Sequence, residues 1–406
     1  MVDNSCKDGA RSVSKMKKTE IGVIPEDWEV KSIKDFCQII VGGDVDLNSF
    51  SSVEDNLFQY PIFSNTVSNK GLYGFSLNYK INANSVTVVG RGIGIGTAFS
   101  REGKYTPIGR LIVLDLSNTN INNQFLANYI NSNLEIYDES GGIPQLTGIS
   151  LGKYQIPLPP LAEQEAIATA LSDADAWIDR LEQLIAKKRS IKQGAMQELL
   201  TPPSEELVLS GVEAWDVKKL GEVAEIIIGL TYSPNDVSEY GTLVLRSSNI
   251  QNNKLAFNNN VFVNMKLPER VIVKENDLLV CVRNGSKQLI GKCALIDKKT
   301  AGQAFGAFMS IIRCDFGEYL YHYFQTNHIQ NQIDENLGAT INQLTNAVLK
   351  SFEIYIPKSL SDQERIATIL SDMDAELDAL QKQLDKAQQI KQGMMQELLT
   401  GRVRLV

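Results

Sequence analysis

Two long stretches of the chain repeat apolar residues every three or four positions. The first covers residues 164–201, and the second covers residues 363–400 with the same rhythm. An average spacing of about 3.5 residues puts apolar side chains on one stripe of a helix, which suits packing against a second helix. The pattern therefore predicts two amphipathic helices. At a rise of about 1.5 Å per residue, each is on the order of 55–60 Å long.

The two stretches are copies of one another. Residues 163–201 and 362–400 are identical at 23 of 39 positions, polar as well as apolar. A repeat of this kind sets the architecture, so we expect the copies to pack antiparallel along an apolar seam. The seam residues are Ile167, Leu171, Ile178, Leu181, Ile185, Ile366, Leu370, Leu377, Leu380 and Leu384. The alternative, that these are core helices of two separate bundles, stays open.

The duplication extends to the regions before each helix. Each region opens on a tryptophan, Trp28 or Trp215, and closes on Gln-Leu-Thr at 145–147 or 343–345. Short strand-like runs between Gly- and Asn-rich turns, followed by helical segments, indicate a mixed α/β fold. The middles of the two regions, 41–107 and 230–308, show no convincing sequence alignment. This pattern favours two similar scaffolds with different variable middles.

The predicted layout has five parts. Residues 1–20 form a flexible lead-in, 21–155 the first globular domain and 156–203 the first helical spacer. Residues 204–355 form the second globular domain, and 356–406 the second helical spacer.

The net charge of −8 is unevenly distributed. The helical copies carry −2 and −4, whereas residues 69–110 carry +5 and residues 271–313 carry +4. Local charge, rather than the total, is what a polyanion meets, so each globular domain has a basic region suited to DNA. The five scattered cysteines favour a reducing cytoplasm, and no apolar run is long enough to span a membrane.

The sequence contains no convincing active site. Gly90 to Gly96 alternate with other residues but do not match a dinucleotide-binding or Walker motif, and no pair of cysteines has metal-ligand spacing. The two histidines, His322 and His328, fit packing or surface roles better than catalysis or metal binding. We also find no motif for methyl transfer to a base amine. We therefore predict no catalytic residue, metal site or cofactor in this chain.

The basic regions do contain residues suited to DNA. Arginine fits the edge of guanine, Asn and Gln fit adenine, and Lys and Ser can hold phosphates. For each residue alone a solvated surface side chain is the better interpretation, so the clusters carry the prediction. The candidates are Asn65, Asn69, Lys70, Arg91, Arg101, Lys104 and Arg110 in the first domain, and Arg246, Ser248, Asn249, Gln251, Arg283, Asn284, Lys287 and Gln288 in the second.

The repeated helices carry a family resemblance. Pro-Pro-Leu-Ala-Glu-Gln at 159–164, leading to Lys-Gln-Gly-Ala-Met-Gln-Glu-Leu-Leu-Thr at 192–201 and its copy from 391, resembles the specificity subunit of type I restriction-modification systems. The resemblance implies two α/β target-recognition domains and two conserved helices in an antiparallel coiled coil. Each domain would read half of a split target, while the helices would set the spacer and dock modification subunits.

The resemblance also implies the partners. These are double-stranded DNA, two modification (methyltransferase) subunits that bind S-adenosylmethionine, and restriction subunits that act as ATP-dependent translocases and nucleases. Three alternatives remain: a coiled-coil scaffold without its own DNA specificity, the specificity subunit of a related methyltransferase-nuclease system, and a self-sufficient enzyme. The last would need a cofactor motif that the sequence does not show.

Overall fold

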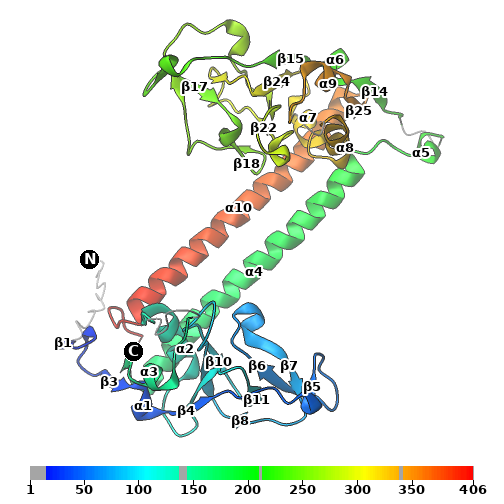
Figure 1. The fold of residues 1–406 in the computed structure, drawn as a ribbon. Coiled ribbons are helices and arrows are strands. Elements are labelled where there is room, and N and C mark those ends of the chain that lie inside the picture. Colours follow the sequence, from blue (N-terminus) through cyan, green and yellow to red (C-terminus); the bar gives the residue numbers. More distant parts are fainter. Residues whose placement is uncertain (1–14, 137–143, 210–212, 338–341, 406) are drawn as a thin grey trace, which may run out of the picture. The chain divides into compact units, whose positions relative to one another are not determined.

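The computed structural model describes residues 15–136, 144–209, 213–337 and 342–405. The chain forms two compact units. Unit 1 consists of Met1–Glu182 and Lys382–Val406, and unit 2 of Gln183–Gln381. Both are mixed α/β, as expected (Figure 1). Each long helix contributes one part to each unit.

Unit 1 is built on an antiparallel sheet in the order β10-β9-β12-β4. Every residue of β9 is buried, and α2 packs over the sheet through Phe125 and Leu126. The Asn122 side chain starts α2 by accepting from the Phe125 N–H at 2.9 Å. The elements before the long helix are β1 Met16–Thr19, β2 Gly22–Pro25, β3 Glu29–Ser32, α1 Ile33–Phe36, β4 Gln38–Val41, η1 Leu47–Ser49, β5 Phe50–Ser51, β6 Tyr60–Phe63, η2 Ser68–Gly71, β7 Leu72–Ser76, β8 Ile81–Asn82, β9 Ser85–Val88, β10 Ala98–Arg101, β11 Lys104–Pro107, β12 Ile112–Asp115, α2 Asn123–Asn133, α3 Gly148–Gly152 and β13 Gln155–Leu158.

Unit 2 has the corresponding sheet in the order β22-β21-β24-β15. Its buried strand β21 takes the central place that β9 takes in unit 1, and α7 packs where α2 packs. The elements are α5 Glu205–Leu209, β14 Asp216–Lys219, α6 Leu220–Val223, β15 Glu225–Ile228, η3 Pro234–Asp236, β16 Val237–Ser238, β17 Thr242–Leu245, η4 Ser247–Asn249, β18 Ile250–Gln251, β19 Lys254–Leu255, β20 Phe262–Val263, η5 Glu269–Val271, β21 Leu278–Cys281, η6 Lys287–Leu289, β22 Cys293–Leu295, β23 Ala304–Phe305, β24 Met309–Arg313, α7 Gly317–Tyr323, α8 Asn327–Asn336, α9 Asn346–Ser351 and β25 Glu353–Ile356.

Strand register aligns the two middles, which the sequence alone does not. Ile112 pairs with Val41 and Val88, and Ser310 pairs with Ile228 and Val280. A second sheet in each unit contains one parallel pair, β6 with β11 and β17 with β23. The backbone frame is therefore repeated through the region where sequence similarity is lost.

A glycine at the same place in each frame shows why this register needs small residues. A Cβ on Gly42 would lie 2.9 Å from the Ile108 nitrogen, and one on Gly229 would lie 2.1 Å from the Gly306 oxygen. Both positions follow the first strand of the main sheet, where the chain passes close to the loop after β11 or β23. Only a residue without a side chain permits this approach.

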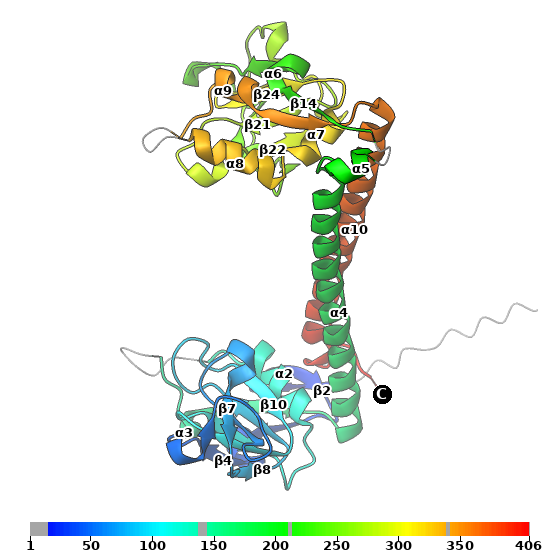
Figure 2. The same ribbon diagram turned by 90° about the vertical axis from the view of Figure 1, so that its right-hand side faces the viewer.

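The long helices are α4, Leu161–Leu199, and α10, Leu360–Leu398. Both begin a few residues before the expected starts. In unit 2, Lys188 bonds to Glu376 and Lys192 to Asp374, an order that makes the helices antiparallel there. In unit 1, Lys391 bonds to Asp175, and the end of α10 shares a core with the start of α4. Figures 1 and 2 show the two helices side by side within each unit.

The expected seam residues lie mostly inside. Ile167, Leu171, Leu181, Ile185, Ile366, Leu370, Leu380 and Leu384 are buried, and Ile178 and Leu377 are half-buried. Ile167 and Leu171 belong to the core of unit 1, and Ile366 and Leu370 to the core of unit 2. These positions therefore pack on the globular parts as well as on the facing helix.

The expectation of a flexible lead-in up to residue 20 needs correction. Residues 1–14 lie outside the described part of the chain, but Met16–Thr19 form β1, which pairs antiparallel with β2. The Thr19 hydroxyl donates to the Gly22 carbonyl at 2.8 Å and closes the turn. Within the described residues, no helix combines the length and hydrophobicity needed to cross a bilayer.

Candidate nucleic-acid interface

Three loops of unit 2 meet where sequence reasoning placed candidate DNA contacts. They are the turn after β17, the loop after β21 and the loop between β23 and β24. The Asn284 amide donates to the Ser247 hydroxyl at 3.1 Å, which joins the first two. The backbone N–H groups of Val282 and Arg283 donate to the Phe308 carbonyl at 3.0 and 3.1 Å, which joins the third. The fold thus gathers residues that are far apart in sequence.

Arg283 and Phe308 form the exposed edge of this cluster. The Arg283 side chain is exposed, Phe308 is 55% exposed, and the guanidinium carbon lies 5.1 Å from the ring centroid. A planar cation on an aromatic face keeps its N–H groups free at the edge. Phe308 is not recognisable as a candidate from the sequence, because only the loop packing brings it beside Arg283.

A pocket of about 480 Å³ lies beside the same cluster, lined by Arg246, Ser248 and Phe308 among others. The Arg246 guanidinium donates to the Asn259 side chain at 3.0 Å, which fixes its direction. Two buried polar atoms here, Arg246 Nε and Ser248 Oγ, have no hydrogen-bond partner in the described chain. Unmatched donors beside an exposed aromatic ring suit a polar, planar ligand group.

The corresponding loops of unit 1 are joined by one side chain. Asn65 accepts from the Gly90 N–H at 2.9 Å and donates to the Gly109 carbonyl. This fixes Arg91 and Arg110, both exposed, on neighbouring loops. Both the oxygen and the nitrogen of the Asn65 side-chain amide are bonded to backbone groups. Asn65 therefore positions the loops and is not a free group for reading DNA.

Arg110 and Ile93 give these loops an unusual surface. Arg110 has a φ of 66°, the left-handed region that costs energy for a residue with a side chain. Ile93 is 93% exposed at the loop tip, flanked by Gly92 and Gly94 with positive φ. The alternating Gly and Ile in the sequence did not indicate that the Ile93 side chain would be exposed to solvent.

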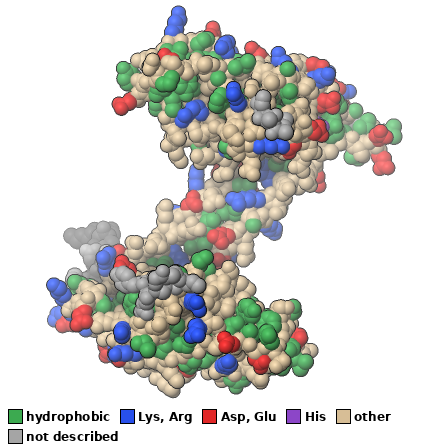
Figure 3. Space-filling model, viewed as in Figure 1, with side chains coloured by type: hydrophobic (Ala, Val, Ile, Leu, Met, Phe, Trp, Pro, Cys, Tyr) green, Lys and Arg blue, Asp and Glu red, His purple; other side chains and the backbone are tan. Residues whose placement is uncertain are grey.

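A second surface of unit 1 combines aromatic and basic groups on the five-stranded sheet β5-β7-β6-β11-β8. The Lys104 ammonium lies 4.7 Å from the Tyr79 ring centroid, and Tyr60 packs edge-on to Tyr79. Figure 3 shows hydrophobic side chains gathered over this part of unit 1, where Leu57 is 70% and Tyr73 is 52% exposed. Such a mixed surface suits contact with a macromolecule better than plain solvent exposure.

The expectation that Arg101 contacts DNA needs correction. Arg101 is 9% exposed, its Nε donates to the Thr87 hydroxyl at 3.0 Å, and its guanidinium lies 3.7 Å from the Phe63 centroid. Burial lowers its pKa to about 10. Arg101 is therefore part of the interior of unit 1.

Asn249 is likewise corrected to a structural role. It is fully buried, donates to the Ala256 carbonyl at 2.9 Å and accepts from the Arg246 N–H at 3.0 Å. It holds the turn that presents Arg246, so substituting it would change the loop rather than remove a contact.

The other candidates stay on the surface. Asn69 and Lys70 are exposed in a tight turn with φ of 46° and 49°. Gln251 and Gln288 are exposed, and Lys287 lies 3.7 Å from the Asp334 carboxylate. These five residues remain predicted contacts.

His322 could be mistaken for a catalytic base. Its Nε2 lies 3.0 Å from Ser371 Oγ and its Nδ1 3.9 Å from Asp374 Oδ2. However, His322 is fully buried, and 3.9 Å is too long for a hydrogen bond. Lys192 occupies Asp374 at 2.6 and 2.7 Å. This group is a buried polar contact between α7 and the long helices, as the packing interpretation predicted.

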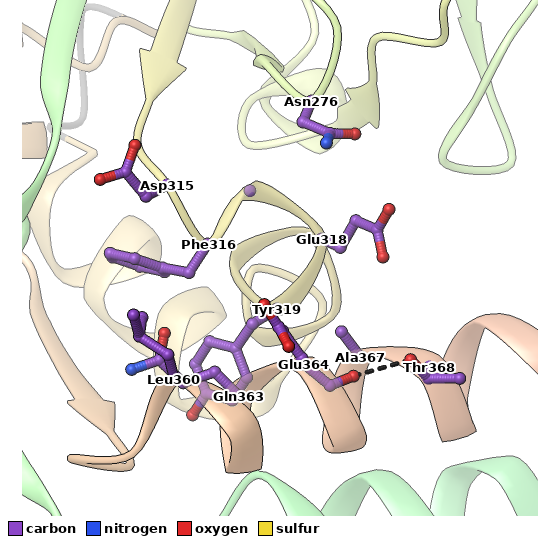
Figure 4. Close-up of a pocket in the computed structure, with 11 residues that line it drawn as sticks. Asn276, Asp315, Phe316, Glu318, Tyr319, Leu360, Gln363, Glu364, Ala367 and Thr368 are labelled. Atoms are coloured by element: carbon purple, nitrogen blue, oxygen red, sulfur yellow. Dashed lines mark hydrogen bonds between the residues drawn. The ribbon is translucent and has the colours of Figure 1, made fainter.

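A pocket of about 350 Å³ in unit 2 has the wrong charge for DNA. Figure 4 shows Asp315, Glu318 and Glu364 around it, near the starts of α7 and α10. Gln363 is 5% exposed there, and its Oε1 has no partner in the described chain, whereas Oε1 of the equivalent Gln164 accepts from Asn122 N. Three carboxylates repel phosphates, so this pocket lies outside the candidate interface. Within the described residues, no cluster of His, Cys, Asp or Glu could hold a metal ion.

Comparison with known protein families gives two consecutive matches. The model of the type I restriction modification DNA specificity domain matches residues 25–193 and again residues 212–392. This chain belongs to that family. Each match covers one globular part and most of the helix that follows, so the family repeat coincides with the internal repeat of this specificity protein.

The specificity protein has similar relatives over nearly its whole length. The type I restriction enzyme MjaVIII specificity subunit of Methanocaldococcus jannaschii is 25% identical over 94% of both chains. The putative MjaX specificity subunit of the same organism is 25% identical over 96% of both chains. A crystal structure of the type I restriction-modification S subunit from M. genitalium has the same fold, with a TM-score of 0.61 at 16% identity. It covers 91% of this chain and 96% of that one.

Proposed function

We propose that this chain is the DNA-recognition subunit of a type I restriction-modification complex, and that each unit reads one half of a split target. The observation that carries the proposal is the double family match onto two copies of one backbone frame. Both M. jannaschii relatives are named as type I specificity subunits, one of them putatively. The chain itself supplies recognition, and catalysis belongs to its partners in the cytoplasm.

The exposed loop clusters of the two units support separate readings of DNA. Arg91 and Arg110 stand on the loops of unit 1, and Arg283 with Phe308 on those of unit 2. Arginine at a loop edge suits base edges in the major groove, while nearby lysines suit phosphates. Because the two clusters differ in chemistry on the same frame, we infer two different half-sites.

The helices support a spacing and docking role. Ile191 in unit 2 and its repeat counterpart Ile390 in unit 1 are 47% and 43% exposed on the long helices. Apolar side chains exposed at repeated positions fit two equivalent protein contacts. We therefore infer that two modification subunits dock on the helices, that the helices set the spacer as a coiled coil, and that restriction subunits join the assembly.

The test is to co-express the chain with its neighbouring methyltransferase subunit and map methylated adenines across the host genome. A split motif with a fixed gap supports the proposal and supplies both half-sites. A contiguous motif contradicts it. Finding no motif, together with no salt-dependent duplex binding by the assembled complex, would instead favour a scaffold without DNA specificity.

A further inference from the structure

One arginine occupies the same register position in both units. Val88 pairs with Ile112 in unit 1, and Val280 pairs with Ser310 in unit 2. Arg91 and Arg283 each come three residues after that pairing position. Both leave a central strand of the main sheet, so the frame delivers them to equivalent points.

The repeated Gln-Leu-Thr motif fixes the backbone of both arginines. Arg91 forms an isolated antiparallel bridge with Gln145, and Arg283 forms one with Gln343. In unit 1 the Leu146 N–H donates to the Gly90 carbonyl at 2.8 Å. In unit 2 the Leu344 N–H donates to the Val282 carbonyl, also at 2.8 Å. The motif therefore has a structural purpose, which is to hold the residue that precedes each arginine.

The leucines of the motif anchor this arrangement in the cores. Leu146 is 4% exposed and Leu344 is 1% exposed, and each belongs to the core of its own unit. A buried anchor with paired backbone bonds keeps the arginine Cα in place. A guanidinium on such a support loses less freedom on binding than one on a free loop.

The side chains of Arg91 and Arg283 are both exposed. Neither guanidinium makes a hydrogen bond or ion pair with another described residue, although Arg283 rests on Phe308. By contrast, Arg313 is bound by Asp277 at 2.7 Å, and Arg101 is buried against Thr87. A fixed arginine with free donors matches the O6 and N7 acceptors of guanine.

The residue beside each arginine comes from an equivalent position of the frame, but its type differs between the two units. The backbone register that aligns Ile108 with Gly306 also aligns Arg110 with Phe308. Unit 1 thus sets a second cation near its arginine, where unit 2 sets an aromatic ring. The position is shared, and the chemistry around it is specific to each unit.

From this equivalence we propose that Arg91 and Arg283 are the corresponding base-reading residues of the two units, each donating to a guanine in its own half-site. The proposal rests on the proposed function, since it assigns residues to the reading of the two half-sites. It makes Arg110 and Phe308 neighbours that tune the reading, and it makes Gln-Leu-Thr a positioning motif.

The experiment maps methylated sites for the wild-type chain, Arg91→Ala and Arg283→Ala, each co-expressed with the methyltransferase subunit. Arg91→Ala should lower the preference for guanine at one position of one half-site by about tenfold. The other half-site should stay unchanged. Arg283→Ala should do the reverse, so each variant carries its own internal control.

If an alanine variant lost all methylation, the lysine variants would still test the proposal. Arg91→Lys and Arg283→Lys keep the charge needed for a phosphate but lose the bidentate fit, so they should also relax one guanine position. The inference is overturned if the motif is unchanged, if both half-sites relax together, or if methylation falls at all sites with the motif intact. In each of these cases, a split motif for the wild-type chain would still support the proposed function. A contiguous wild-type motif, or no motif together with no salt-dependent duplex binding by the assembled complex, overturns the proposed function itself.

Discussion

The two units hold the start of their long helix differently, although the helices are near-copies. In unit 1, the Glu163 carboxylate is buried and accepts from Trp28 Nε1 at 3.0 Å and from Arg404 at 2.6 and 2.7 Å. In unit 2, the repeat counterpart Asp362 is half-exposed and pairs with Arg365 on its own helix. In unit 1, Arg404, which follows α10, thus acts as a clamp on Glu163, whereas the equivalent Asp362 in unit 2 pairs only within its own helix among the described residues.

Unit 2 has instead a buried polar contact with the side of its helix. His322 bonds to Ser371 at 3.0 Å. Aligning Phe125-Leu126 of α2 with Tyr319-Leu320 of α7 puts Asn128, which is half-buried, at the equivalent position of unit 1. Duplication therefore preserved the backbone frame and the Lys–Asp pairs between helices. The side chains that secure each helix start diverged, which shows that the frame tolerates more than one way of being fastened.

The largest difference between the units should come from removing the clamp. Arg404→Ala leaves the Glu163 carboxylate buried with Trp28 as its remaining donor, which should cost unit 1 about 3–5 kcal/mol. Hydrogen exchange on the full chain should show faster exchange in the peptides of unit 1 and little change in unit 2. Arg402→Ala is the matched control, because Arg402 is 67% exposed and its contact with Glu397 is 3.7 Å. Equal loosening of both units would contradict the comparison.

Unit 2 should lose folding stability as the pH falls. Burial lowers the pKa of His322 to about 4, below its ordinary value of 6.5. The unfolded chain therefore binds the proton first. Stability from neutral His322 is complete above about pH 6.5, falls as the pH drops towards 4, and changes by at most about 3 kcal/mol.

His322→Asn, which copies the residue of unit 1, isolates this effect. The difference in unfolding free energy between variant and wild type should stay constant above pH 7 and shift in favour of the variant between pH 6.5 and 4. Denaturant melts followed by hydrogen exchange in α7 would measure it. A difference that does not vary with pH would show that His322 is not buried in its neutral form.

The smallest expected difference is in the stability that each Lys–Asp pair between the long helices contributes to its unit. Lys192 and Asp374 are 12% and 21% exposed, whereas Lys391 and Asp175 are 24% and 48% exposed. Lys192→Ala should cost about 1.5–3 kcal/mol, because a charge-assisted bond is lost in a partly buried site. Lys391→Ala should cost less than about 1 kcal/mol. Thermal melts of the two variants would compare them, and equal costs would mean that burial does not set their strength.

The sequence predicted the repeat, the two helices and most of their buried face, because apolar periodicity and duplication are written directly in it. It could not align the two middles, since their correspondence lies in backbone register, as at Ile112 and Ser310. It also overlooked Phe308 and placed Arg101 on the surface. The stacking of Arg101 on Phe63 depends on the strands β10 and β6, and the packing of Phe308 on Arg283 depends on two loops, all of which meet only after folding.

The central claim is that each unit reads its half of the target through the variable middle of a shared frame. Two chimeras test it, each carrying a segment from a specificity subunit of known target. One replaces residues 42–110 and the other replaces residues 229–308 with the equivalent segment. The boundaries follow β4 and precede β12 in unit 1, and follow β15 and precede β24 in unit 2. Mapping methylated adenines should show one half-site changed in each chimera, with the other half-site and the gap preserved. A change in both half-sites, or in the gap, would contradict the account.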